Sequence, residues 1–222
     1  IYPDGFLPSI QTDISDMSLL AGIKGYAEIW NYDFSVTHGT NELQYSVINS
    51  LNTSLGPGSQ TEFDAGTLTY DTTIINADVS RLLDTQLFFS EMNFAIGAEY
   101  RHEGYDIEAG EENSYAQGTF GPGGVTTDPV AGPFGAAGAQ VFPGFTPESA
   151  GDNSRHNYSF YVDLEADVLE NWNVAVAGRF EDYSDFGSTF NWKMSHRVTV
   201  TDALALRASV STGFRAPSLQ QQ

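Results

Sequence analysis

The sequence predicts an all-β protein, an antiparallel meander of about eight strands. Apolar residues recur at every second position through much of the chain, whereas the 3.6-residue period of amphipathic helices is hardly present. The connections between the predicted strands are alternately short and long, which is typical of consecutive hairpins whose short turns share one edge of a sheet. The 222 residues suffice for one large domain or two small ones.

Six strands follow from clean alternation of apolar and polar residues. They cover residues 30–37, 92–101, 158–165, 172–181, 190–198 and 204–211. Two less regular segments, at 17–24 and 68–80, complete the count of eight.

The predicted connections differ strongly in length. Short ones cover 24–29, 82–87, 167–171 and 199–203, and longer ones cover 39–66, 104–155 and 183–188. The segment 104–155 is rich in Gly, Pro and small polar residues, so we expect a flexible loop and no further element there. A loop of this length within a domain is usually functional.

Composition excludes several classes of protein and site. The chain has 9 Lys and Arg against 29 Asp and Glu, a net charge of −20, which argues against a nucleic-acid partner. It has no Cys, so disulfides, thiolate metal sites and a Cys nucleophile are excluded. It has no apolar run of the length that a membrane-spanning helix needs.

Two architectures fit the alternation: a soluble antiparallel sandwich and a transmembrane barrel. The alternation of short turns with long loops is typical of outer-membrane barrels. Aromatic residues also collect near the ends of the apolar faces, as in the belts found at membrane interfaces. These are Trp30 and Trp172 near short turns, and Tyr100, Tyr158, Phe180 and Phe190 near longer loops.

Charged residues of the strands supply the third argument for a barrel. Those considered occupy the non-apolar phase: Glu99, Arg101, Asp163, Glu165, Arg179, Glu181, Lys193, Arg197 and Arg207. An Arg or Lys facing lipid at mid-depth costs about 2–4 kcal/mol, so a barrel requires this segregation, whereas in a sandwich it is merely usual. We therefore expect these residues, Lys193 apart, to line the lumen.

The chain reads as an interior piece of a larger barrel. It begins without a signal-like segment and stops directly after a strand-like run. If the eight strands do not close into a barrel, the two edge strands stay unpaired in hydrocarbon, where each backbone amide without a hydrogen-bond partner costs several kcal/mol.

Four segments carry a resemblance to a known family. They are FAIGAEYRHE (94–103), FPGFTPESA (142–150), RFEDYSDFGSTFNWKMS (179–195) and STGFRAPSLQQ (211–221). Together, and in this order, they resemble the barrel of TonB-dependent outer-membrane receptors. The most specific part is the run Gly213, Phe214, Arg215, Ala216, Pro217 and Ser218.

The resemblance implies a 22-stranded barrel in the bacterial outer membrane, closed by an N-terminal plug domain. Such receptors bind a ferric siderophore, cobalamin, haem or an oligosaccharide outside, and import it with energy relayed by TonB. On this basis residues 1–222 form a partial barrel domain without plug or terminal strands, and 104–155 is an extracellular loop. The partners implied are the TonB complex, through the plug, outer-membrane lipid and the ligand.

Two groups of side chains are candidate sites. Aromatic residues of the long loop could stack on a planar or sugar-like ligand, or could keep the loop folded; these are Tyr115, Phe120, Phe134, Phe142 and Phe145. The lumen charges could form an ion-pair ladder or steer the ligand. Arg215 also falls on the lumen phase, where we expect it to brace the inner wall.

No catalytic or metal motif stands out. His38, His102, His156 and His196 are scattered, with His196 on the lipid phase, and no two have metal-ligand spacing. Carboxylates could hold Ca²⁺ at Asp106, Glu108, Glu111 and Glu112, or at Asp182 and Asp185, with a solvated acidic surface as the simpler interpretation. Otherwise no cofactor is expected.

Three functions remain open. The leading hypothesis is a non-enzymatic receptor segment for ligand capture and passage. The alternative is a soluble or surface-attached β-sandwich that binds carbohydrate or acts as an adhesin. An outer-membrane hydrolase comes third, because no Ser, His and carboxylate are predicted to converge.

Overall fold

The structure is a computed structural model that describes residues 1–121, 124–125 and 135–221. The chain forms two compact units. The first, here called the loop unit, comprises Ile1–Met17, Thr40–Asp71 and Gly104–Asn153. The second, the wall unit, comprises Ser18–Gly39, Thr72–Glu103 and Ser154–Gln222.

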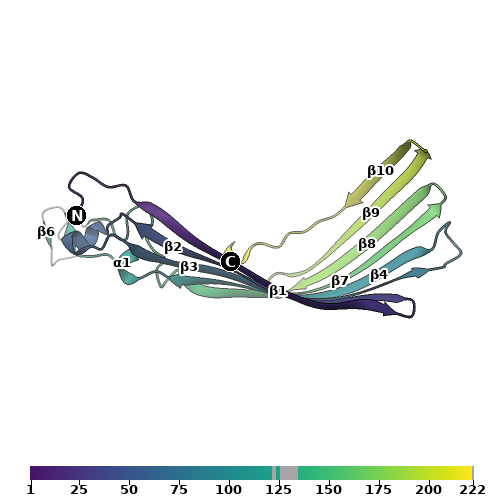
Figure 1. Ribbon diagram of the computed structural model, residues 1–222, viewed down its shortest axis with the longest axis horizontal. Helices are drawn as coiled ribbons and strands as arrows, with labels where there is room; N and C mark the ends of the chain where they lie inside the picture. The colour runs from purple at the N-terminus through teal and green to yellow at the C-terminus, as the bar shows by residue number, and fades with distance from the viewer. Residues whose placement is uncertain (122–123, 126–134, 222) are drawn as a thin grey trace. The chain divides into compact units, whose positions relative to one another are not determined.

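An eight-stranded sheet runs in the order β1-β2-β3-β4-β7-β8-β9-β10 (Figure 1), so consecutive long strands are neighbours. The strands are β1 (Ser9–Ala27), β2 (Trp30–Ile48), β3 (Phe63–Leu83), β4 (Met92–Ala109), β7 (Gly151–Leu169), β8 (Trp172–Tyr183), β9 (Gly187–Thr201) and β10 (Leu204–Ser211). The predicted meander of eight strands is confirmed.

The register of β7, β8, β9 and β10 keeps one kind of residue on each face. Leu164 pairs with Val176, Val176 with Met194, and Met194 with Val210, so one apolar row crosses four strands. The next row on the opposite face joins Glu165, Ala175, Ser195 and Ser209. Because side chains alternate between faces, this register separates an apolar face from a polar one throughout the four strands.

The apolar face is open. Phe160 is 57% exposed, Val176 42% and Leu206 59%. A sandwich would bury these rows against a second sheet, whereas a barrel presents them to lipid. The exposure therefore agrees with the barrel architecture.

The packed hydrophobic core lies in the loop unit instead. Val47, Phe63, Ala65 and Ala139 are buried there, and Tyr45 and Phe142 pack against them. The loop unit therefore has an interior of its own.

Seven of the eight strands are longer than the sequence predicts, β10 being the exception, and the connections are correspondingly shorter except for the one after β3. The connections cover 28–29, 84–91, 170–171 and 202–203 on one edge of the sheet, and 49–62, 110–150 and 184–186 on the other. Because 184–186 is shorter than 84–91, the predicted alternation of short and longer connections does not hold throughout. Alternation reveals a strand only where one face is apolar, so the polar continuations of β2 and β4 went unseen. The long connection is narrower than the predicted 104–155, because β4 continues to Ala109 and β7 begins at Gly151.

That connection also contains regular structure where none was expected. A one-turn helix α1 (Glu112–Tyr115) and two paired short strands, β5 (Phe120–Gly121) and β6 (Gly124–Val125), lie within it. Asn52, which precedes the 3₁₀ helix η1 (Thr53–Gly58), links the connection 49–62 to the connection 110–150. Its buried side chain donates hydrogen bonds to the carbonyls of Asn113 and Ala116 and accepts one from the Ser54 amide. These long-range bonds are invisible in a local pattern.

The chain after β10 leaves the sheet. Residues 212–218 are irregular, and the 3₁₀ helix η2 (Leu219–Gln221) follows with Leu219 buried. Arg215 lies in this irregular segment, because β10 ends at Ser211, and its side chain is exposed. That it braces the inner wall stays a prediction. Among the described residues, none of the helices has the length and apolar content needed to cross a membrane.

Candidate functional site

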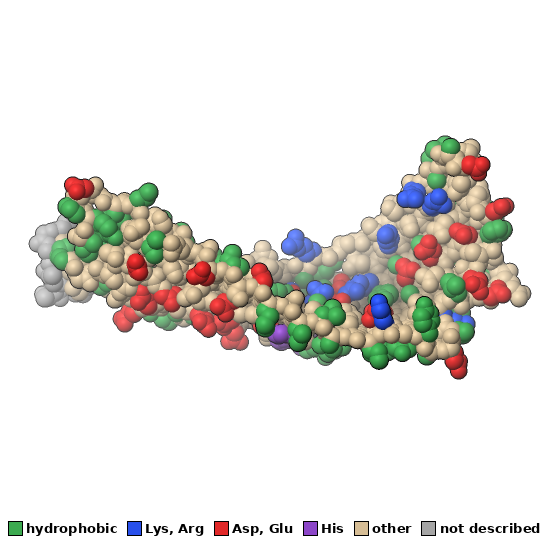
Figure 2. Space-filling view, viewed as in Figure 1, with side chains coloured by type: hydrophobic (Ala, Val, Ile, Leu, Met, Phe, Trp, Pro, Cys, Tyr) green, Lys and Arg blue, Asp and Glu red, His purple; other side chains and the backbone are tan. Residues whose placement is uncertain are grey.

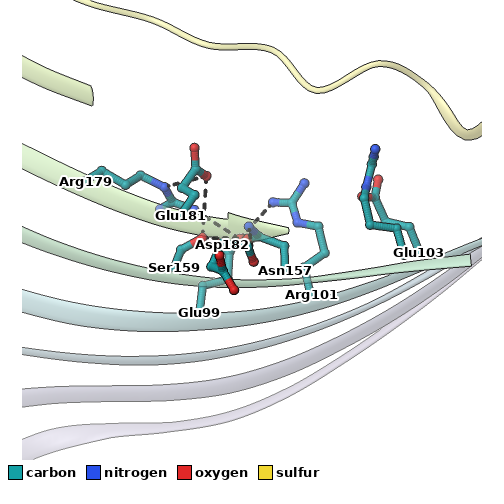
Figure 3. Close-up of polar contacts among 9 residues, drawn as sticks. Glu99, Arg101, Glu103, Asn157, Ser159, Arg179, Glu181 and Asp182 are labelled. Atoms are coloured by element: carbon teal, nitrogen blue, oxygen red, sulfur yellow. Dashed lines mark hydrogen bonds and ion pairs between the residues drawn. The ribbon is translucent and has the colours of Figure 1, made fainter. Parts of the chain in front are cut away.

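The polar face of the wall unit carries a chain of ion pairs (Figure 3). One oxygen of Glu99 on β4 lies 3.2 Å from the guanidinium of Arg101 and 3.2 Å from that of Arg179 on β8. Arg179 also donates to Glu181 at 3.0 Å. The two carboxylates are largely buried and the two guanidiniums are about one-third exposed. These ion pairs join four of the residues that the sequence analysis expected on the lumen side, and their place in a lumen stays a prediction.

The other predicted lumen residues lie on the same face without completing the ladder. Glu165 accepts a hydrogen bond from Asn173, which also donates to Asp167. Arg197 and Arg207 stand directly opposite each other on β9 and β10, and within the described part of the chain neither forms an ion pair. Like charges in this position repel each other.

Asp163 and Lys193 line a hollow of about 590 Å³ in the wall unit, together with Arg179 and Asn191. A second hollow of about 690 Å³ is lined by Lys24, Asn31, Asp78 and Tyr161, among others. The Tyr161 hydroxyl donates to Asp78 at 2.6 Å. The polar face therefore offers both charged and neutral groups to a molecule passing along it.

Arg155 on β7 is a second charged centre, which the sequence analysis missed. Its guanidinium is only 5% exposed and lies 2.9 Å from Glu103 and 3.4 Å from Asp185. The hydrogen bonds and charges of Glu103 and Asp185 compensate the cost of burying this guanidinium. Arg155 shares the phase of Asn157 and Tyr161, so extending the alternation of β7 backwards would have revealed it.

Arg155 also anchors the segment that carries the Phe-Arg-Ala-Pro-Ser run. It donates to the carbonyl of Pro217 at 2.8 Å, and its guanidinium lies over the rings of Tyr183 and Phe186. Phe214 packs against the same two rings. The run is thus bound to the polar face through one buried cation and an aromatic cluster.

The predicted ligand-binding aromatics are dispersed in the loop unit. Phe142 and Phe145 contact each other at 5.8 Å between ring centroids, and both contact Tyr45, at 5.3 and 5.9 Å. Tyr115 ends α1, Phe120 lies on β5, and Phe134 falls outside the described residues. The contacts of Phe142 and Phe145 are thus explained by folding of the loop. Ligand contact by the five aromatic residues stays a prediction.

The acidic candidates for Ca²⁺ are also spread out. Asp106 and Glu108 lie on β4, while Glu111 accepts hydrogen bonds from the Gln60 side chain and the Asp64 amide. Glu112 begins α1, Asp182 lies on β8, and Asp185 pairs with Arg155. In the part of the chain that the structure describes, no three His, Asp or Glu are grouped to hold a metal ion. The Ca²⁺ prediction remains untested.

Comparison with known proteins gives one family and one fold. A family model described as "TonB dependent receptor-like, beta-barrel" matches residues 10–222. The crystal structure of the siderophore receptor PirA from Acinetobacter baumannii is similar, with a TM-score of 0.62 and 15% identity over 93% of this chain. The chain spans 26% of the length of that receptor. No curated protein matches.

The two-faced open sheet, the ion-pair chain on its polar face and the anchored Phe-Arg-Ala-Pro-Ser run agree with the family match. Because that match covers nearly the whole chain, the chain belongs to the family of TonB-dependent receptor β-barrels.

Proposed function

We propose that the chain is a wall segment of a bacterial outer-membrane receptor that captures a scarce ligand outside and imports it without covalent chemistry. The observation that carries this proposal is the register of β7 to β10, which places exposed apolar rows on one face and, on the other, rows that contain the charged and polar residues. In a barrel, the first face meets lipid and the second surrounds a watery lumen.

Import requires partners beyond this chain. We propose that a plug domain of the complete receptor fills the lumen against the polar face, and that the TonB complex acts on the plug. Arg197 and Arg207, which form no ion pair with any described residue, suit contact with acidic groups there, since two like charges opposite each other are destabilising on their own.

A ferric siderophore is the first ligand to test, because the similar PirA structure is that of a siderophore receptor. Cobalamin, haem and an oligosaccharide are the alternatives. The test compares import of iron-loaded siderophores by cells with and without the complete receptor, each with and without TonB. We expect surface binding to need only the receptor, and import to need both. A receptor that is soluble without detergent, or import that persists without TonB, would contradict the proposal.

Two substitutions separate ligand contact from loop folding. Tyr115 is half-buried and makes no ring contact among the described residues, whereas Phe142 packs on the buried core. We expect Tyr115→Ala to weaken ligand binding roughly tenfold, as loss of an aromatic contact worth about 1.5 kcal/mol does, with the loop unit still folded. Phe142→Ala should expose the loop unit to protease. Equal ligand affinity in Tyr115→Ala and the unsubstituted receptor would show that Tyr115 does not contact the ligand.

A further inference from the structure

Arg81 is the exception to the segregation of charge. Of the nine Lys and Arg, all except Arg215 lie in strands that the structure describes. Seven of these occupy the polar phase of their strands, and Arg81 occupies the apolar phase of β3, in line with Ile75, Ala77 and Val79. A cation therefore stands on the face that the barrel turns toward lipid.

Aromatic side chains hold the guanidinium in place. It lies 5.1 Å from the ring centre of Trp30, and Trp30 contacts Phe94 edge-on at 6.2 Å. Both rings belong to the apolar phases of β2 and β4, on either side of β3. A cation over an indole face is stabilised by the ring quadrupole, and more so where water is excluded.

No described acidic side chain compensates the charge of Arg81. Its Nε–H is buried and has no hydrogen-bond partner, and the ion pairs of the described residues do not include it. The nitrogens at the tip of the guanidinium are the donors left for a group outside the chain. An uncompensated charge on a low-dielectric face is costly, so an external anion would stabilise it.

The depth of Arg81 identifies the class of anion. It lies two residues before β3 ends at Leu83, next to the connection 84–91, which shares one edge of the sheet with the two-residue turns 28–29, 170–171 and 202–203. Trp30 is the first residue of β2 after the first of these turns. Short turns lie on the periplasmic side of such barrels, and Trp marks the interface where lipid head groups begin. A cation costs little at that level, whereas it is expensive at mid-depth.

We propose that Arg81, Trp30 and Phe94 form a binding site for the phosphate of a glycerophospholipid in the periplasmic leaflet. The planar guanidinium matches two phosphate oxygens. The apolar row of Ile75, Ala77 and Val79 runs along the same face for the acyl chains. The site rests on the outer-membrane location proposed above, and goes beyond the transport function.

The test measures lipid bound to the complete receptor in mild detergent by native mass spectrometry. Phosphatidylglycerol is added at increasing concentration to the parent, Arg81→Gln and Lys24→Gln. Lys24 is the matched control, because it lies near the same end of the wall unit but on the polar phase of its strand. We expect Arg81→Gln to bind the tightest phosphatidylglycerol roughly tenfold more weakly, as loss of a charge-assisted contact does, and Lys24→Gln to match the parent.

Further arms separate the possible anions and guard against misfolding. Inorganic phosphate should not displace the lipid. Lipopolysaccharide that stays bound from the outer leaflet should be equal in all variants, because its phosphates lie at the opposite end of the barrel from Arg81. Arg81→Lys should bind with intermediate affinity, and Trp30→Leu should lose affinity although Arg81 remains; these two carry the test if Arg81→Gln does not fold.

Equal phosphatidylglycerol affinity in Arg81→Gln and the parent would overturn the site. Displacement of the lipid by inorganic phosphate would also overturn it. The same holds if Arg81→Gln weakens the binding of lipopolysaccharide and leaves that of phosphatidylglycerol unchanged. Ligand import by Arg81→Gln should stay at the parent level, so failure of the lipid site leaves the transport proposal separately testable.

Discussion

At the scale of single residues, Arg155 and Arg81 show two ways to keep a cation in a barrel wall. Arg155 is enclosed by carboxylates, a carbonyl and two rings, whereas Arg81 rests on one ring and lacks an acidic partner among the described residues. The sequence analysis missed both. Arg155 sat at the boundary of a predicted loop, and Arg81 lay beyond the last clear apolar position of its strand.

We expect Arg155→Gln to release the segment that follows β10. Removing one partner of a buried ion pair costs about 3–5 kcal/mol, because the remaining charges are left uncompensated. Amide hydrogen exchange at residues 212–221 of the complete receptor should become much faster. Arg207→Gln, at an exposed arginine, is the control, and unchanged exchange in Arg155→Gln would show that the segment is held by other contacts.

Gly56 offers a second test at this scale. Its φ of 63° and ψ of −142° lie in a region that glycine adopts and other residues avoid, and a Cβ there would overlap the Phe120 ring. We expect Gly56→Ala to destabilise the loop unit by about 1–3 kcal/mol, measured as faster nicking of the 110–150 connection by protease. Gly58→Ala is the matched control, since a Cβ there meets nothing within 4 Å. Equal nicking in both variants would contradict the argument.

At the scale of elements, alternation predicted the strands well where one face is apolar. The segments 92–101, 158–165 and 172–181 all lie within observed strands, because lipid on one side and polar contents on the other impose a period of two. The parts of β2 and β4 that follow the predicted segments have no such contrast between their two faces. They are strands because they pair with neighbouring strands, so the full lengths of β2 and β4 could not be predicted. The ladder of Glu99, Arg101, Arg179 and Glu181 was predictable from phase, but its distances were not.

The phase of β8 makes a direct prediction about stability. Val176 lies on the apolar face and its neighbour Ala175 on the polar face, opposite Glu165. Val176→Arg should lower the free energy of unfolding in lipid vesicles by about 2–4 kcal/mol, because a cation would face hydrocarbon at mid-depth. Ala175→Arg should be nearly neutral. The assignment of faces fails if the two variants unfold at the same urea concentration.

At the scale of the whole molecule, charge is divided between the two units. The residues of the loop unit include 14 of the 29 Asp and Glu and none of the nine Lys and Arg. All the blue side chains in Figure 2 accordingly lie over the wall unit. Periodicity reveals no such division, which becomes visible only when the fold groups distant segments.

This division predicts how salt affects ligand capture. A field of one sign slows the approach of a like-charged ligand, and screening grows as the Debye length falls from about 30 Å at 0.01 M to about 10 Å at 0.1 M salt. We expect association of an anionic ligand with the complete receptor to accelerate severalfold over this range in stopped-flow measurements, and further with Ca²⁺. A neutral ligand of similar size should show no change, and faster capture of the anion at low salt would refute the prediction.

The length of β1 to β4 has a consequence for cells that carry the receptor. These strands contain 18–21 residues, whereas about 9–11 suffice to cross a bilayer. In the proposed outer-membrane location, roughly half of each strand would therefore stand outside the hydrocarbon as hydrogen-bonded sheet. Because proteases cut backbone that can be pulled into their clefts, shaving intact cells should cleave only within connections such as 49–62 and 110–150, and antibodies raised against short linear peptides from the strands should fail to recognise the native surface.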